Sequence, residues 1–422
     1  QFKPRIMAKY RALKAANQPT VIEKVVYSEY SSKIEGTAQN NPALFADHGT
    51  ISNKVGYVAN AFSWGFNRHL CYDAKYTTWW SFFYRNRDVG TPGWIVYSYS
   101  TDNGKTWSDQ YRLTGKDDVE SADFDVHCED GSVNVVYSNT ACTELNWKRG
   151  ELKSREIDWK VDTTVMKSPV SYSFVIPSIT YYQGNPVISA HDQSEEGQLG
   201  GHKRTYVAMS TDPKGVDWQP YVTIFDRPIN KQLSPLSFTS LVTIKSELYA
   251  IVNGQHQTLF LVKYLGDNQW SDPEILDFLN YGGGTPEWVT VTDSVGNLHL
   301  FYPVKGERIF NYATFDGVNW NIRGIGTRAL GVSQLSATID DDDNIYVFSN
   351  DNLIVTLIKN GEILGSMPLF AESKKHIIYI NTMNKFIDNK MGVAWVDGNE
   401  LDPHLGFLCL EKNGELFLNR CQ

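Results

Sequence analysis

Arginine, histidine and glutamate residues recur along this chain at positions where they could bind an acidic ligand or act on it. An arginine guanidinium carries forked N–H donors that match a carboxylate or a sulfate, while histidine and glutamate can bind hydroxyls or transfer protons. The residues that we predict to bind a ligand are Arg68, Arg85, His191, Arg204, His256, Glu287 and Arg308. They are distant in sequence, so they form one site only if the fold gathers their segments.

The elements that must position them are short β-strands and tight turns. WIVYSYS at 94–100 alternates and is rich in β-branched and aromatic residues, and a turn signal, TDNG, follows it. In this turn an aspartate can accept bonds from backbone N–H groups, a glycine can adopt a positive φ, and a tryptophan can fold back over the hairpin. The motif, which we interpret as structural rather than catalytic, consists of Ser100, Asp102, Gly104 and Trp107.

Degraded copies of this turn repeat along the chain. STDPKGVDW (210–218) has one extra residue and TFDGVNW (314–320) has one fewer, while other copies keep an acid and the aromatic residue. The tryptophans at 107, 159, 218, 270 and 320 are separated by 52, 59, 52 and 50 residues. A period near 50 residues with about four strands per unit is typical of a β-propeller. We predict an all-β fold, a β-propeller of seven four-stranded blades, with six as the alternative, and these tryptophans in equivalent places.

The motif Ser-x-Asp-x-Gly-x-x-Trp resembles the Asp-box, or BNR repeat, of sialidase-like β-propellers. The resemblance extends over most of residues 61–422, although only 100–107 matches the box in full. In that family the box occupies the turn between the third and fourth strands of a blade, away from the catalytic face. The resemblance implies a fold and not an activity, because the same box occurs in lectins, lyases and non-catalytic surface proteins.

The sequence does not contain the full set of catalytic motifs of either enzyme class in this superfamily, the sialidases or the polysaccharide lyases. Sialidases use three arginines, a Tyr–Glu pair and an acid, and the nearest string to their Arg-Ile-Pro is PRIM at 4–7, in the wrong order and far from the first blade. Some seven-bladed relatives are polysaccharide lyases that use His, Tyr and Arg. The loop HDQSEEGQLGGHKR and the residues beside it supply those types in His191, His202, Arg204 and Tyr206.

The propeller geometry places the predicted ligand residues on one face. Loops that join strand two to strand three, and segments that enter strand one, share this face, and the Asp-box turns lie on the other. Short loops around a common axis would bring distant residues together there, so we predict that any ligand binds on this face.

The distribution of charge bears on possible partners. The chain carries a formal net charge of −9, but the first 19 residues contain five Lys or Arg residues and no acid. The remaining acidic body disfavours nucleic acid as a partner. The basic segment either docks on an acidic surface or is a solvated terminus. We divide the chain into an N-terminal basic arm and lead-in segment, 1–60, and the propeller, 61–422.

Metal ions and cofactors are not expected. Asp340 to Asp343 lie in a predicted hairpin turn and lack the spacing of a calcium loop, so we interpret them as a solvated turn.

The five cysteines are expected to remain mostly buried thiols. A turn centred on Asn413-Gly414 would place Cys409 opposite Leu418 and Cys421 opposite Gly406, on opposite faces of the sheet. Cys128 and Cys142 would lie about 20 Å apart, too far for a bridge.

The sequence leaves two classes of function open. The first is a secreted or cell-surface, non-catalytic module that binds an acidic glycan or a partner protein, or builds an assembly. The alternative is a carbohydrate-active enzyme that acts on acidic glycans, either a polysaccharide lyase or a sialidase-like hydrolase. The chain contains no apolar run long enough to span a bilayer. Since it begins at Gln1, we interpret it as a mature form whose leader has been removed.

Overall fold

The computed structural model is an all-β structure, and the residues that it describes contain no helix, hence none that could cross a membrane. These residues are 49–52, 67–85, 93–114, 124–171, 173–192, 202–228, 238–253, 258–278, 288–303, 309–326, 334–350, 353–370, 377, 379–399, 402–413 and 417–421.

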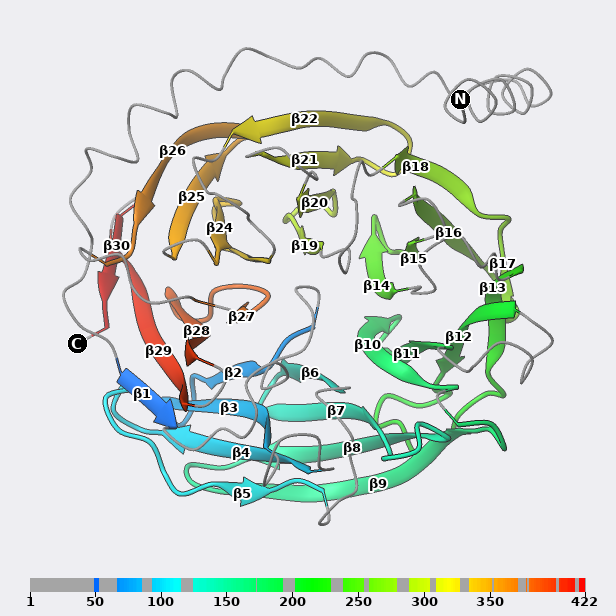
Figure 1. Ribbon diagram of the computed structural model, residues 1–422, viewed down its shortest axis with the longest axis horizontal. Helices are drawn as coiled ribbons and strands as arrows, with labels where there is room; N and C mark the ends of the chain where they lie inside the picture. The colour runs from blue at the N-terminus through cyan, green and yellow to red at the C-terminus, as the bar shows by residue number, and fades with distance from the viewer. Residues whose placement is uncertain are drawn as a thin grey trace.

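The described strands form seven antiparallel sheets around a central axis, which confirms the predicted seven-bladed propeller (Figure 1). Blade one consists of β2 (Leu70–Asp73), β3 (Thr78–Arg85), β4 (Trp94–Ser100) and β5 (Tyr111–Arg112). Blade two consists of β6 (Phe124–Glu129), β7 (Ser132–Ser138), β8 (Glu144–Leu152) and β9 (Ile157–Lys167). Blade three consists of β10 (Val175–Tyr182), β11 (Asn185–His191), β12 (His202–Met209) and β13 (Val222–Pro228). Blade four consists of β14 (Thr239–Ile244), β15 (Glu247–Asn253), β16 (Thr258–Gly266), β17 (Gln269–Trp270) and β18 (Glu274–Phe278). Blade five consists of β19 (Val289–Thr292), β20 (Leu298–Pro303), β21 (Ile309–Phe315) and β22 (Trp320–Gly326). Blade six consists of β23 (Leu335–Ile339), β24 (Ile345–Ser349), β25 (Ile354–Lys359) and β26 (Glu362–Pro368).

Blade seven closes the ring with strands from both ends of the chain. Its inner strands are β27 (Tyr379–Thr382), β28 (Lys390–Asn399) and β29 (Asp402–Asn413). β1 (Gly49–Ser52) pairs with β29 at residues 405–407, and β30 (Phe417–Arg420) pairs with it at residues 410–413. Residues 49–52, which we counted in the lead-in segment, therefore take part in the propeller.

Seven hydrophobic clusters fill the spaces between neighbouring blades, so both faces of every sheet are covered. Strand β3, TWWSFFYR, shows the reason. Trp79 and Phe83 belong to the cluster with blade seven, while Trp80 and Phe82 belong to the cluster with blade two. Because successive side chains of a strand point to opposite faces, a strand that is apolar at nearly every position must be covered on both sides.

The Asp-box of blade one is a hydrogen-bonded turn, as its residue types predict. Asp102 accepts bonds from the hydroxyl of Ser100 (2.8 Å) and the backbone N–H of Thr106 (2.9 Å). Gly104 has a φ of +83°, and a Cβ there would lie 2.2 Å from the ring of Phe407 in blade seven. The Trp107 ring also packs edge-on against Phe407, with ring centroids 5.0 Å apart. The box therefore fixes blade one to blade seven.

Blade three repeats this arrangement two interfaces further on. A Cβ on Gly215 would lie 2.4 Å from the indole of Trp147 in blade two, and the ring of Trp218 packs edge-on against the same indole at 5.4 Å. Both boxes thus dock on an aromatic residue in the third strand of the preceding blade.

The five repeat tryptophans occupy equivalent places, as predicted. Trp159, Trp270 and Trp320 lie in or begin the fourth strand of their blades and pair with residues of the third strand. Trp218 forms an isolated bridge with Ser210, and Trp107 follows the corresponding turn in blade one.

The expectation that the cysteines remain thiols is wrong for four of the five. Leu410 pairs with Arg420, so Cys409 lies directly opposite Cys421, and the two form a disulfide. The turn is one residue longer than we expected, and this shift moves both cysteines to the same face. A second disulfide joins Cys71 and Cys128, with Cα atoms 5.8 Å apart, on the inner strands of blades one and two. Cys142 is a buried thiol, as predicted.

Candidate functional site

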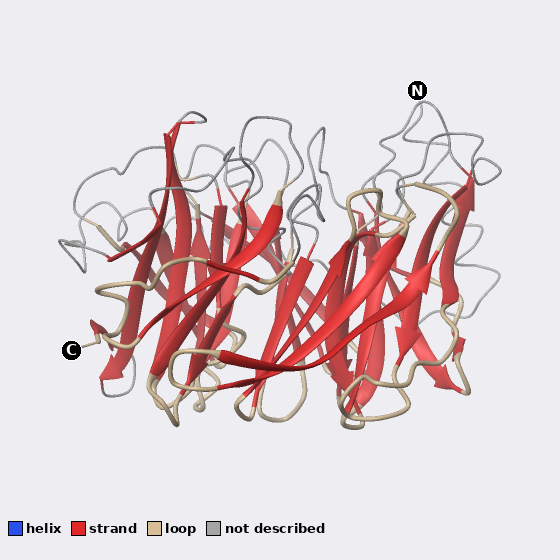
Figure 2. Ribbon diagram, turned by 90° about the horizontal axis from the view of Figure 1, so that it is seen from below, coloured by secondary structure: helices blue, strands red, loops and turns tan. Residues whose placement is uncertain are grey.

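Two cavities adjoin the propeller axis on the face that carries the turns between first and second strands. We call it the turn face; its short turns lie along one side of the molecule in Figure 2. The first cavity, of about 690 Å³, reaches the turns at 73–75, 129–131 and 384–388, and the second, of about 440 Å³, reaches the turn at 245–246. Both cavities are lined by Arg68, Val126, His127, Glu129, Asn384 and Lys385. We therefore treat them as one space, the axial chamber.

Arg68 forms the inner end of this chamber. The residue lies just before β2 and is 5% exposed. Its Nη1 donates to the hydroxyls of Ser336 and Thr382, both at 3.2 Å, and its Nη2 donates to the carbonyl of Thr290 at 3.1 Å. These acceptors belong to blades six, seven and five, so one guanidinium from blade one reaches across the axis.

Asp125 holds the backbone of Arg68 in place. Its carboxylate accepts the N–H groups of Arg68 (2.6 Å), Val126 (3.0 Å) and Ile179 (2.8 Å), and so connects blades one, two and three. Burial raises the pKa of Asp125 to about 6, against the opposing effect of these N–H donors and of the Arg68 charge. Burial likewise lowers the pKa of Arg68 to about 10, which leaves the guanidinium charged at neutral pH.

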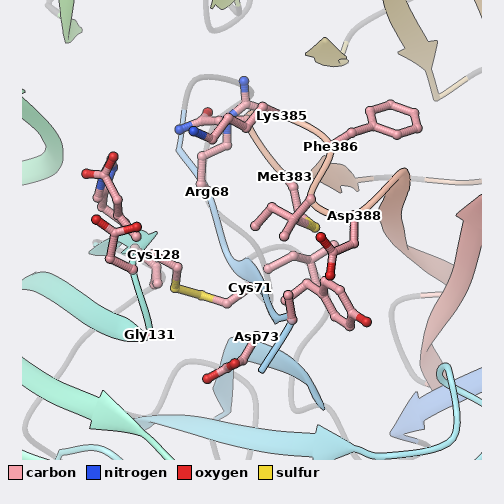
Figure 3. Close-up of a pocket in the computed structure, with 18 of the residues that line it drawn as sticks. Arg68, Cys71, Asp73, Cys128, Gly131, Met383, Lys385, Phe386 and Asp388 are labelled. Carbon is pink, nitrogen blue, oxygen red and sulfur yellow. A yellow bond between two sulfur atoms is a disulfide. The ribbon is translucent and has the colours of Figure 1, made fainter. Parts of the chain in front are cut away.

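Lys385 supplies a second cation next to Arg68 (Figure 3). It is exposed, and it lies in the connection between β27 and β28, which contacts blade six through a bridge between Lys385 and Ile339. Within the described part of the chain, Lys385 forms no ion pair. The carboxylates that line the first cavity belong to turns at its mouth: Asp73, Glu129, Asp130, Asp341 and Asp388. The turns of the two cavities thus carry these acids together with Lys75 and Lys245, whereas Arg68 and Lys385 lie where the two cavities meet.

The structure describes four of the seven predicted ligand residues, and only Arg68 among them lines the chamber. Arg85 ends β3 and donates to the side chain of Gln110. His191 is fully buried at the end of β11, where its ring packs edge-on against Phe238 with centroids 5.3 Å apart. Arg204 pairs with Asp226 at 3.2 Å. The other three, His256, Glu287 and Arg308, lie outside the described residues, so a ligand site on the opposite face remains a prediction.

The residue types that suggested a lyase do not converge on one point. His191 packs toward Phe238 of blade four, whereas the ring of Tyr206 packs against Phe174 and belongs to the cluster between blades two and three. Successive residues of a strand point to opposite faces of the sheet. His191 pairs with Thr205, the residue before Tyr206, so the side chains of His191 and Tyr206 lie on opposite faces of the blade-three sheet. The side chain of His202 lies outside the described residues.

Lys385, His127 and Glu129 were not among the predicted ligand residues, because those were chosen on the opposite face. One signal was present in the sequence. Residues 383–389 separate β27 from β28, whereas the corresponding strands are separated by two residues in blade three (183–184) and by two in blade four (245–246). This longer connection is what brings Lys385 to the axis.

The aspartates at 340–343 form a structural turn. Asp340 accepts the backbone N–H groups of Asp342 and Asn344, both at 2.9 Å, and pairs with Lys412 of blade seven at 2.8 Å. Its side chain is only 2% exposed, so the expectation of a solvated turn is wrong for Asp340. No group of three potential metal ligands occurs within the described parts of the chain.

No protein-family model matches this sequence, and no curated protein is significantly similar to it. Solved structures with a related architecture include the NanB sialidase of Streptococcus pneumoniae, which is 13% identical, with 91% of this chain and 72% of that chain covered and a TM-score of 0.46. The polysaccharide lyase Uly1 is 11% identical, with 88% and 99% covered and a TM-score of 0.49. AofleA of Arthrobotrys oligospora is 13% identical, with 69% and 83% covered and a TM-score of 0.42. These similarities concern the fold alone. The class that the structure defines is a seven-bladed β-propeller.

Proposed function

We propose that this chain is a non-catalytic binding module for an acidic glycan, whose acidic group is held on the propeller axis by Arg68 and Lys385. The observation that carries the proposal is the presence of both cations at the place where the two cavities meet. Charge-assisted hydrogen bonds are the stronger kind, and they gain strength where water is partly excluded. The cavity volumes, about 690 and 440 Å³, fall in the range of small-ligand sites.

The lining of the second cavity favours a sugar over other acids. Hydroxyl side chains from the inner strands of three consecutive blades line it, and each can donate and accept hydrogen bonds to sugar hydroxyls. They are Ser178, Thr180, Ser240, Thr243, Thr290 and Thr292. Ser178, Ser240 and Thr243 already have partners within the chain, so a sugar would use their remaining hydrogen-bonding capacity and the hydroxyls of the other three residues.

The proposal includes a secreted or cell-surface location, which the disulfides support. Disulfides persist in oxidising compartments, and this chain contains two, Cys71–Cys128 and Cys409–Cys421. The first of them also lies in the wall of the first cavity.

The substitution Lys385→Gln tests the proposal because it removes the charge of an exposed residue. We expect affinity for carboxylated and sulfated glycans on an array to fall about 10-fold, the usual cost of losing a hydrogen bond between charged groups. Lys105→Gln is the matched control, since Lys105 is an exposed lysine in the blade-one Asp-box turn, on the same face. Equal binding by both variants, or no binding of any acidic glycan by the parent, would contradict the proposal.

An assay of the same purified protein for released reducing ends tests whether the chain is catalytic. A binding module leaves acidic polysaccharides intact, whereas a lyase or hydrolase releases new reducing ends from them. Release that is lost in Glu129→Gln would favour the enzyme alternative, because Glu129 and His127 form an acid–base pair in the chamber wall.

A further inference from the structure

A row of polar side chains lies between blades two and three, beside the axial chamber. His127 on β6 pairs in register with Asn134 on β7, which pairs with Arg149 on β8. Tyr181, at the end of β10 in blade three, packs against this row, with its ring centroid 4.8 Å from that of His127. We call these four residues and Glu129 the polar seam.

The seam is continuous with the chamber. His127 and Glu129 line both cavities, and Tyr181 lines the second one. The His127 Nε2 lies 3.5 Å from a carboxylate oxygen of Glu129, whose side chain is 51% exposed. The seam therefore presents a hydrogen-bonding wall next to the cations on the axis.

The protonation states give this wall both a donor and an acceptor. Burial raises the pKa of Tyr181, and the nearby charge of Arg149 opposes the rise. The phenol thus keeps its proton and can donate it to a ligand oxygen. The pKa of Glu129 is lowered by its hydrogen bond from His127 and by the charge of Lys385, so Glu129 remains an acceptor.

Two buried atoms of the seam have no hydrogen-bond partner within the described part of the chain. They are the side-chain oxygen of Asn134, which is fully buried, and Nε of Arg149. Buried polar atoms are nearly always paired, so these two atoms call for a partner beyond the described residues, such as a water.

We propose that the polar seam is a second sugar subsite, which binds a hydroxyl-bearing unit joined to the acidic unit at Arg68 and Lys385. Vicinal sugar hydroxyls each donate and accept, and so they match the phenol of Tyr181 next to the carboxylate of Glu129. This inference rests on the proposed function and extends it: the preferred ligand is an acidic oligosaccharide, not an isolated sugar acid.

The test compares glucuronate with glucuronate-containing disaccharides by calorimetric titration. Tyr181→Phe and Glu129→Gln should weaken disaccharide binding about 10-fold each, because each removes one ligand hydrogen bond from a partly buried site. Glucuronate binding should change less than about 2-fold. Tyr182→Phe is the matched control, since Tyr182 is the next residue but packs toward Tyr264 of blade four.

The outcomes distinguish the subsite from the proposed function. Seam variants that weaken both ligands equally, or neither, would overturn the subsite while Lys385→Gln still reports on the acidic group. A parent protein that binds the disaccharides no more tightly than glucuronate would also overturn it. Thermal unfolding of each variant checks that a loss of affinity is not a loss of fold.

Discussion

At the scale of single residues, the propeller axis is a polar core inside an apolar ring of sheets. His69 is fully buried, and its ring stacks on Phe124 with centroids 4.1 Å apart. Burial lowers the pKa of His69 from 6.5 to about 3, whereas burial raises the pKa of Asp125 from 3.8 to about 6. The unfolded chain therefore protonates His69 first as pH falls, and the folded chain protonates Asp125 first. The two residues have opposite effects on stability in acid.

We predict that His69→Gln becomes more stable relative to the parent as pH falls from about 6 to 4. His69 contributes stability that is present above its unfolded pKa of 6.5 and lost as pH falls toward 3, so its removal abolishes this loss. The difference in unfolding free energy should change by up to about 1.4 kcal/mol per pH unit. Urea denaturation at several pH values measures it, and a constant difference would contradict the assigned protonation state.

At the scale of elements, the Asp-box turn acts as a clamp between blades. We predict that Asp102→Ala lowers the free energy of unfolding by about 1–3 kcal/mol, because turn N–H groups lose their acceptor. Asp109→Ala is the control, an exposed acid shortly after the same turn. Chemical denaturation gives the stability, and binding of acidic glycans by the folded fraction should not change. A stable variant that loses binding would show that the box has a functional role.

The blades were predictable from sequence because their information is local and repeated. Each tryptophan marks the same point of its unit, and the strands alternate or are apolar throughout. The disulfide Cys409–Cys421 was missed because a turn one residue longer reverses which face a cysteine occupies. The chamber was missed for a different reason. It forms only where inner strands of many blades meet, and its cation Lys385 comes from a single long connection that no other described blade repeats.

At the scale of the whole molecule, the ring depends on the contact between its first and last blades. The cluster between blades seven and one contains Ile51 of β1, which is 5% exposed, together with Phe407 of β29 and Trp79 of β3. β1 pairs with β29 at Phe407, the residue on which the Asp-box of blade one also docks. An open ring would expose this cluster and the edge of β29 to water.

We predict that deletion of residues 1–52 destabilises the propeller by about 2–5 kcal/mol relative to deletion of residues 1–48, the cost of losing one buried isoleucine and its strand contacts. The two proteins differ only by β1, Gly49–Ser52, so the comparison isolates ring closure from whatever precedes it. Differential scanning calorimetry should show a lower melting temperature for the shorter protein, with a broader transition as blade seven separates from blade one. Identical transitions would mean that β29, held to β30 by the disulfide Cys409–Cys421, closes the ring without β1.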